Sequence, residues 1–180
     1  MQAILRKTRQ LSAVVALCVA GSASAAVPSA GEVLNAALTE AKAQQKAVLV
    51  HFGASWCTWC RHLDAMLEDP ELGRLFHDNY VIAHLTIRES ADKKALENPG
   101  AQEIADAAGG ASGGVPFYVF FDSNGKRLAT SMAMPNGDNI GFPVSPEEIE
   151  AFVGLLEKTA PRMTAAERNR VAGYLSKQKH

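Results

Sequence analysis

The sequence predicts an α/β fold: a three-layer α/β/α sandwich with a mixed central sheet and with helical additions at the N- and C-terminal ends. The run Ala47–Phe52 is short and nearly continuously apolar, which is typical of a central strand covered on both faces. Patterns of helix and strand alternate after this run, until the chain turns back at Asn124–Gly125, a pair that favours a hairpin. Alternation that ends in a hairpin predicts a mixed sheet with helices on both faces.

The first 25 residues are predicted to be a secretory signal peptide. A basic start precedes the apolar run Leu11–Ala20, and Ala23–Ala25 has the small residues of a cleavage site. The apolar run is too short to span a bilayer, and no later segment is long and apolar enough. Cys18 leaves a lipoprotein cleavage site as the alternative, but Leu17 stands where that site needs a small residue. We therefore expect export, with the periplasm as compartment, and no stable membrane insertion after the signal is removed.

The rest of the chain is expected to form one domain over residues 26–160 and a helical extension over residues 161–180. A length of 180 residues with 47% hydrophobic residues suits one domain with its own core. The whole chain has a formal charge of −1, and loss of the three basic residues of the signal peptide changes it to −4. Such a mildly acidic chain lacks the electrostatic footprint of nucleic acid binding, so we expect no nucleic acid partner.

The elements follow from capping motifs, apolar spacing and breakers. Ser29–Glu32 and Ser145–Glu148 have the form of capping boxes, and Thr164–Glu167 caps a last helix. Asp69–Pro70 breaks one helix, and a glycine-rich loop at 109–114 precedes the hairpin. Helices are expected at 29–44, 57–67, 71–77, 101–108, 145–158 and 164–176, and strands at 47–52, 80–87, 117–121 and 126–131. The loop 134–144 and the last helix are interpreted as structural elaborations, with a partner surface as the alternative.

The cysteine pair carries the functional hypothesis. After signal removal only Cys57 and Cys60 remain, and a bridge three residues apart closes too small a loop to stabilise the fold much. Cys57 lies at a helix N-terminus, where free N–H groups and the helix dipole favour a thiolate. Cys60 lies one turn on, on the same face. Cys57 can therefore attack a partner disulfide, and Cys60 can resolve the mixed disulfide.

Three other uses of the pair were weighed. A zinc site needs two more ligands, and His62 cannot easily complete a tetrahedron with both thiolates. Covalent haem attachment needs histidine directly after the second cysteine, where Arg61 stands. An inert disulfide without redox function remains an alternative. We expect no metal and no organic cofactor, because the dithiol itself is the redox centre.

The segment Ser55–Cys60 resembles the thioredoxin superfamily, and the resemblance extends over residues 47–156. It is carried by a strand that ends in a Trp-Cys-x-x-Cys helix start, and by Gly114–Pro116, which is similar to the cis-proline loop of that family. Asp69–Pro70 is similar to the Asp-Pro element that follows the motif helix in the exported branch of thioredoxin-like proteins. The resemblance implies a thioredoxin-like fold and disulfide exchange with protein substrates. It also implies a second protein that donates electrons to the dithiol or accepts electrons from it.

The resemblance also implies roles for residues around the dithiol. Pro116 is expected to be cis and to face the dithiol, so that the backbone of Val115 pairs with an extended substrate segment. Trp56 is expected to shield the dithiol and to contribute to docking, and Trp59 to contact partners. Simple packing is the alternative for both tryptophans.

His51 departs from the family pattern. Thioredoxins usually carry a buried acid at this strand position, which moves protons for the resolving cysteine. His51 is either a proton acceptor for Cys60, since histidine titrates near neutral pH, or a core histidine satisfied by one hydrogen bond. His84 occupies the strand position where thioredoxins often carry a lysine near that acid, so the resemblance also places His84 beside His51 on the adjacent strand.

The sequence thus predicts an exported thiol–disulfide oxidoreductase with a redox-active Cys57–Cys60 disulfide, acting as a reductase or isomerase. A dedicated disulfide oxidase is the nearest alternative. A thioredoxin-fold binding or chaperone module without turnover is the alternative from another functional class.

Overall fold

The computed structural model describes residues 26–178, so the predicted signal peptide lies outside the described residues. The α-helices are α1 (Ala30–Gln44), α2 (Thr58–Leu67), α3 (Gly73–Asn79), α4 (Ala101–Ala105), α5 (Pro146–Thr159) and α6 (Ala165–Leu175). The strands are β1 (Ala47–Gly53), β2 (Tyr80–Thr86), β3 (Phe117–Phe121) and β4 (Arg127–Thr130). A 3₁₀ helix, η1 (Ala91–Leu96), and a π-helical turn, η2 (Asp106–Gly110), lie on either side of α4.

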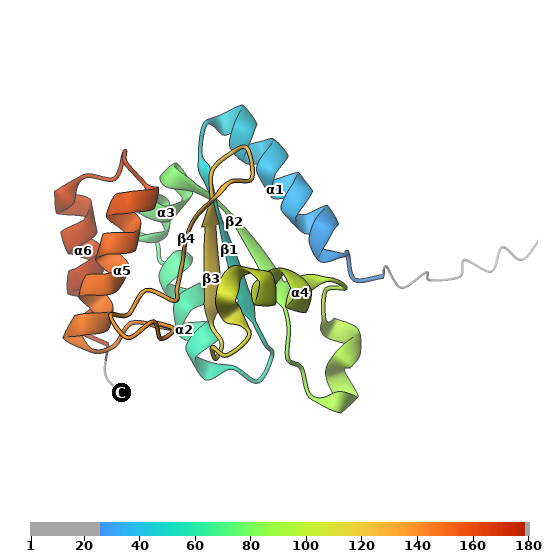
Figure 1. The fold of residues 1–180 in the computed structure, drawn as a ribbon. Coiled ribbons are helices and arrows are strands. Elements are labelled where there is room, and N and C mark those ends of the chain that lie inside the picture. Colours follow the sequence, from blue (N-terminus) through green and yellow to red (C-terminus); the bar gives the residue numbers. More distant parts are fainter. Residues whose placement is uncertain (1–25, 179–180) are drawn as a thin grey trace, which may run out of the picture.

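The four strands form a mixed sheet in the order β2-β1-β3-β4. β1 pairs with β2 in parallel and with β3 antiparallel, and β3–β4 is the predicted hairpin. α1 and α4 cover one face of the sheet, while α2, α3, α5 and α6 cover the other (Figure 1). Because successive side chains of a strand point to opposite faces, Val48, Val50 and Phe52 pack under α1, and Leu49 packs under α2. The predicted three-layer α/β/α sandwich is confirmed.

Most predicted elements are present, and their capping boxes form. The side chains of Ser29, Ser145 and Thr164 each accept a hydrogen bond from the N–H group three residues on. The short helix predicted at 71–77 instead spans Gly73–Asn79, because Asp69 Oδ1 accepts the N–H groups of residues 71 and 72 and keeps them in a turn.

Two elements after β2 differ from the prediction. The helix expected at 101–108 keeps α-helical geometry only to Ala105. The next residues form the wider π-helical turn η2, which ends the helix because Gly109 adopts a left-handed backbone conformation with a φ of 99°. No helix or strand was expected over residues 91–96, where η1 lies. It has no buried residue, so the apolar spacing by which a helix is recognised in a sequence is absent from it.

Both C-terminal segments join the core. Val171 and Leu175 of α6 are fully buried in the cluster that also holds residues of α2, α3 and α5. Ile140 and Phe142 bury the loop 134–144 in the same cluster. These segments therefore complete one face of the sandwich, and the loop lies against the end of α2 where the cysteines are.

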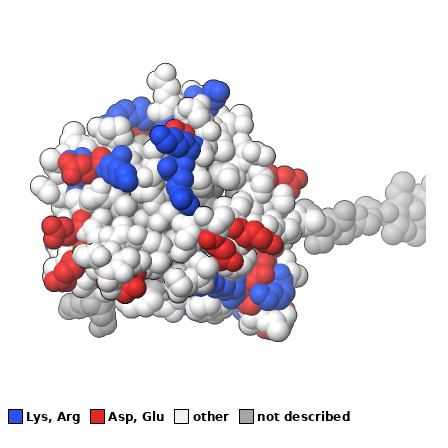
Figure 2. All heavy atoms as spheres, viewed as in Figure 1, with Lys and Arg blue, Asp and Glu red and all other residues white. Residues whose placement is uncertain are grey.

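The surface carries mixed charge. On the face shown in Figure 2, basic and acidic side chains are interspersed, without the broad basic area that a nucleic acid backbone requires. Among residues 26–178, none of the helices has the length and hydropathy needed to cross a bilayer.

Candidate active site

Cys57 is the N-cap residue of α2, and it is joined to Cys60 by a disulfide. The N–H group of Cys60 donates a hydrogen bond to Cys57 Sγ over 3.0 Å, so the sulfur takes the place of the oxygen that usually caps a helix. Hydrogen bonding to a charged form favours that form, and the helix N-terminus adds positive potential. When the disulfide is reduced, this position stabilises a Cys57 thiolate.

The predicted proline loop lies against the dithiol. The Val115–Pro116 peptide bond is cis, and the carbonyl oxygen of Val115 lies 3.5 Å from Cys57 Sγ. Asn139 Nδ2 donates hydrogen bonds of 3.0 Å to the carbonyl oxygens of both Gly114 and Pro116. The loop 134–144 thus fixes the residues on either side of Val115, a contribution that the sequence did not reveal.

The two tryptophans flank sulfurs that are nearly enclosed. Cys57 and Cys60 are each only 3% exposed, whereas Trp56 is 55% and Trp59 is 42% exposed. The indole N–H of Trp56 donates to the carbonyl oxygen of Arg88 over 2.8 Å. Trp59 stacks on Phe142, with ring centroids 6.0 Å apart and an angle of 16° between the planes. The exposed apolar surface beside the dithiol is therefore held in place on both sides.

Two consecutive residues after β2 brace the motif, and neither was predicted from the sequence. Glu89 is 4% exposed and accepts hydrogen bonds from the backbone N–H and the hydroxyl of Ser55, over 2.5 and 2.8 Å. Arg88 has a left-handed backbone (φ 56°), and its guanidinium donates to the carbonyl oxygens of Gly110, Ala111 and Gly113. These two charged residues directly follow a buried strand that neighbours the strand leading into the cysteine motif. That position was the sequence signal that could have indicated them.

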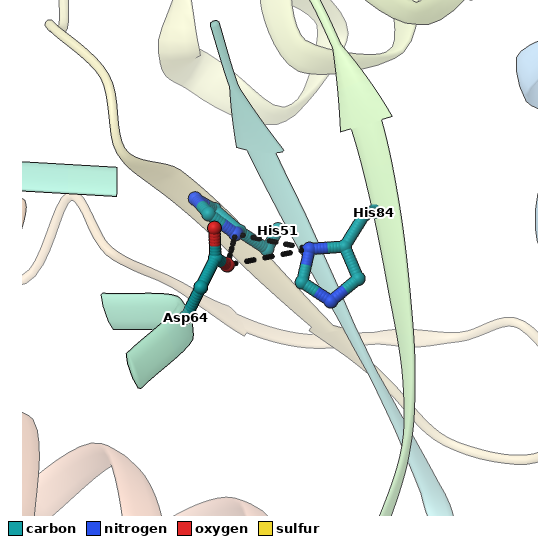
Figure 3. A group of neighbouring side chains, drawn as sticks. All are labelled: His51, Asp64 and His84. Atoms are coloured by element: carbon teal, nitrogen blue, oxygen red, sulfur yellow. Dashed lines mark hydrogen bonds and ion pairs between the residues drawn. The ribbon is translucent and has the colours of Figure 1, made fainter. Parts of the chain in front are cut away.

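His51, Asp64 and His84 form a cluster between the sheet and α2 (Figure 3). The Nδ1 atoms of the histidines are 3.3 Å apart, as expected for residues paired in register on β1 and β2. Asp64 Oδ1 lies 2.9 Å from His51 Nδ1 and 3.4 Å from His84 Nδ1. The predicted neighbourhood of the histidines is confirmed. Asp64 was missed, although it lies four residues after Cys60 on one face of α2.

The cluster shifts the titration of its exposed members. Burial pushes the pKa of Asp64 upward, but the close contact with His51 and the charges of His51 and His84 outweigh it, and the pKa is lowered. Burial, together with the charge of His51, lowers the pKa of His84 against the opposing effect of Asp64 and Glu68. A cavity of about 370 Å³ opens beside the cluster, and Cys60 also lines it.

Gly53 separates the cluster from the disulfide. A Cβ atom at this position would lie 3.3 Å from Cys60 Sγ and 3.3 Å from His51 Nε2, so the two atoms border one small space and are at most 6.6 Å (twice 3.3 Å) apart. His51 is 2% exposed, and its Nε2 has no hydrogen-bond partner among the described residues. The structure thus brings His51 close to the resolving cysteine and leaves its role a prediction.

A family model described as thioredoxin-like matches residues 30–123, which is more than half of the chain. No curated protein matches the chain.

Several solved structures are similar. A disulphide isomerase from Xylella fastidiosa Temecula1 is 21% identical, with 91% of this chain and 100% of that chain covered and a TM-score of 0.48. A DsbH oxidoreductase is 20% identical, with 89% and 95% covered and a TM-score of 0.42. The C-terminal domain of Neisseria meningitidis DsbD, in the oxidised form, is 24% identical, with 58% and 84% covered and a TM-score of 0.40.

Proposed function

The chain belongs to the thioredoxin-like family and its Cys57–Cys60 pair makes it a thiol–disulfide oxidoreductase; from this premise we propose that it is exported and exchanges disulfides with protein substrates, as a reductase or isomerase. One observation supports the exchange with protein substrates. Cys57 Sγ caps α2 and accepts the N–H of Cys60, directly beside Val115. A sulfur that is a good leaving and attacking group therefore meets a backbone segment suited to hold a polypeptide.

In the reducing direction, the Cys57 thiolate attacks one sulfur of a substrate disulfide. The substrate S–S bond breaks, a mixed disulfide forms, and the released substrate sulfur takes up a proton. Cys60, deprotonated, then attacks Cys57 Sγ, which expels the second substrate thiolate and regenerates the Cys57–Cys60 disulfide. Two electrons pass from the dithiol to the substrate, and a partner redox protein returns them. The sequence-based role of His51, as acceptor of the Cys60 proton, belongs to this second step.

Substrate binding is proposed to use the surface around the sulfurs. Within residues 26–178 no hydrogen bond uses the N–H group of Val115, which is therefore open to pairing with an extended chain. Trp56 and Trp59 offer exposed aromatic surface on either side. Because so little of either sulfur is exposed, a docked polypeptide reaches Cys57 only along this surface.

Cysteine variants test the exchange chemistry. Cys60→Ser, with Cys57 reduced, should accumulate a mixed disulfide with insulin whose disulfides are intact or with exported proteins, because the resolving thiol is missing. Cys57→Ser should neither reduce insulin nor trap a partner. An insulin turbidity assay measures the reduction, and mass spectrometry of bands from non-reducing gels detects the mixed disulfide. Partner capture that persists in the double serine variant would show a binding module without turnover, and would contradict the proposal.

The direction of exchange is tested by the reduction potential of the dithiol. A potential of about −270 mV is expected for a reductase, and a potential of about −120 mV would instead indicate an oxidase. Export is tested separately, by determining whether the mature chain isolated from its producing cell begins at Ala26.

Gly53→Ala is expected to slow the resolving step. The added methyl group would lie 3.3 Å from both Cys60 Sγ and His51 Nε2 and would fill the space between them. We expect the mixed disulfide to persist about tenfold longer, which corresponds to about 1.4 kcal/mol of barrier, while the attack by Cys57 is unchanged. Quenched-flow trapping of the mixed disulfide measures this lifetime.

Gly154→Ala is the matched control, because a Cβ at residue 154 meets nothing within 4 Å. A wild-type lifetime in Gly53→Ala would show that Cys60 does not use this space during resolution.

A further inference from the structure

Three potential ligand atoms converge at the cluster of Figure 3, each from a different element. His51 comes from β1, His84 from β2 and Asp64 from α2, so the fold itself fixes their positions. We propose that His51 Nδ1, His84 Nδ1 and Asp64 Oδ1 bind a divalent transition-metal ion of the Zn²⁺ class. This site goes beyond the disulfide exchange proposed above and does not depend on it.

The spacing of the three atoms matches a coordination sphere. Zn²⁺ binds imidazole nitrogen and carboxylate oxygen at about 2.0–2.2 Å, which puts neighbouring ligands about 3.3–3.5 Å apart in a tetrahedron and about 2.9–3.1 Å apart in an octahedron. The observed separations are 2.9, 3.3 and 3.4 Å. A single ion can therefore contact all three atoms with little movement of the side chains.

Hydrogen bonding leaves part of this cluster unexplained. One proton can be shared between the two Nδ1 atoms. Asp64 Oδ1 is nevertheless buried and accepts no hydrogen bond of good geometry from the described residues, and its contacts with the two nitrogens, at 2.9 and 3.4 Å, are ion pairs only while a histidine is protonated. Buried polar atoms are normally paired, and an unpaired one calls for a water molecule or an ion. A cation held between the three atoms satisfies the oxygen and both nitrogens together.

The surroundings admit a hydrated cation. His51 forms the floor of the site, while the side chains of His84 and Asp64 are 52% and 36% exposed and line the cavity of about 370 Å³. Glu68 adds a second negative charge near His84. Arg61 also lines the cavity, but its guanidinium is hydrogen-bonded to the carbonyl oxygen of Ser55 and the hydroxyl of Thr58. Three protein ligands and an open side facing solvent leave room for water in the remaining positions.

The donor set selects the class of metal. Two imidazoles and one carboxylate suit Zn²⁺, Co²⁺, Ni²⁺ or Cu²⁺, whereas Ca²⁺ and Mg²⁺ prefer oxygen ligands alone. The site differs from the zinc site weighed in the sequence analysis, because it uses neither Cys57 nor Cys60. It therefore departs from the expectation of no metal, and it is available while the disulfide is intact.

The test is a calorimetric titration of Zn²⁺ into the whole, untagged chain with its disulfide oxidised. We expect one equivalent to bind, and Co²⁺ to give the visible absorption of a nitrogen- and oxygen-ligated ion without a thiolate band. Asp64→Asn and His84→Ala should each weaken binding more than about a hundredfold, because loss of even a second-shell partner costs about 10–100-fold.

His77→Ala, which changes a histidine of α3 outside the cluster, is the control and should bind as the unaltered chain does. His84 is half exposed, so its variant is expected to fold, and circular dichroism in EDTA checks this. Absence of binding to the oxidised chain, or binding that Asp64→Asn and His84→Ala leave unchanged, would overturn the proposed site. Because the readout is metal binding, failure here would leave the cysteine trapping experiment unaffected, and the reverse also holds.

Discussion

Replacing Glu89 by alanine is expected to lower kcat/KM for insulin reduction by about 10- to 100-fold. The Glu89 carboxylate accepts both the N–H and the hydroxyl of Ser55, two residues before Cys57. Its removal deletes two hydrogen bonds to a carboxylate, and a hydrogen bond to a charged group contributes about 1.5–3 kcal/mol to the braced conformation of the motif. Where the reaction needs that conformation, each 1.4 kcal/mol is a factor of ten in rate. We expect Trp56 and Cys57 to shift from the positions that substrate docking requires. Steady-state turnover with insulin measures the loss.

Two milder variants separate positioning from general damage. Glu89→Gln keeps one acceptor oxygen for Ser55, and Ser55→Ala removes only the hydroxyl, so each should lose several-fold less activity than Glu89→Ala. Thermal unfolding of all three variants shows how much of the loss is global. If Glu89→Ala is folded and fully active, the brace has no part in presenting the dithiol.

Phe142→Ala is expected to destabilise the fold by about 3–5 kcal/mol and to weaken substrate binding as well. Phe142 is 5% exposed in the core, and its ring stacks on Trp59 and packs on His62. Deletion of a buried phenyl ring costs about 3–5 kcal/mol, which lowers Tm by roughly 6–20 °C in a domain of this size. Loss of the stacking removes one contact that orients Trp59, and a pair of this kind contributes about 0.5–1.5 kcal/mol, so KM should rise by about two- to tenfold.

Phe152→Ala provides the comparison, because it deletes the same side chain from the same core cluster, on α5. It should lower Tm similarly while the KM measured below the transition stays at the wild-type value. Tryptophan fluorescence should change more in Phe142→Ala than in Phe152→Ala. An equal effect of the two variants on KM would show that Trp59 does not need Phe142 in order to bind substrate.

The sheet and the dithiol could be predicted because their signals are local. The buried strands β1 and β3 are runs of apolar residues, and the capping boxes of α1, α5 and α6 each lie within four residues. The Cys57–Cys60 motif carries its own geometry, since spacing by three places both sulfurs on one face of a helix. His84 was placed beside His51 by the resemblance to thioredoxins, and the register of β1 and β2 pairs the two residues.

The braces around the dithiol could not be predicted, because their partners are distant in sequence. Glu89 binds Ser55 across 34 residues, and Asn139 binds Gly114 across 25. Both come from irregular segments, where no periodicity indicates which side chain points inward. Asp64 lies on a helix whose face was identified, but its approach to the two histidines is recognisable only when the packing of α2 on the sheet is known.

The long-range braces have a consequence for when the sulfurs become reactive. The contacts of Glu89 with Ser55 and of Asn139 with Gly114 form only when β1, β2 and β3 are assembled. The N–H group of Cys60 is in place to donate to Cys57 Sγ only once α2 has formed. In an unfolded chain the two cysteines are ordinary flexible thiols with a pKa near about 8.5. Completion of the fold thus acts as the activation step, so we expect an unfolded copy to exchange disulfides with its neighbours more slowly than the native protein does.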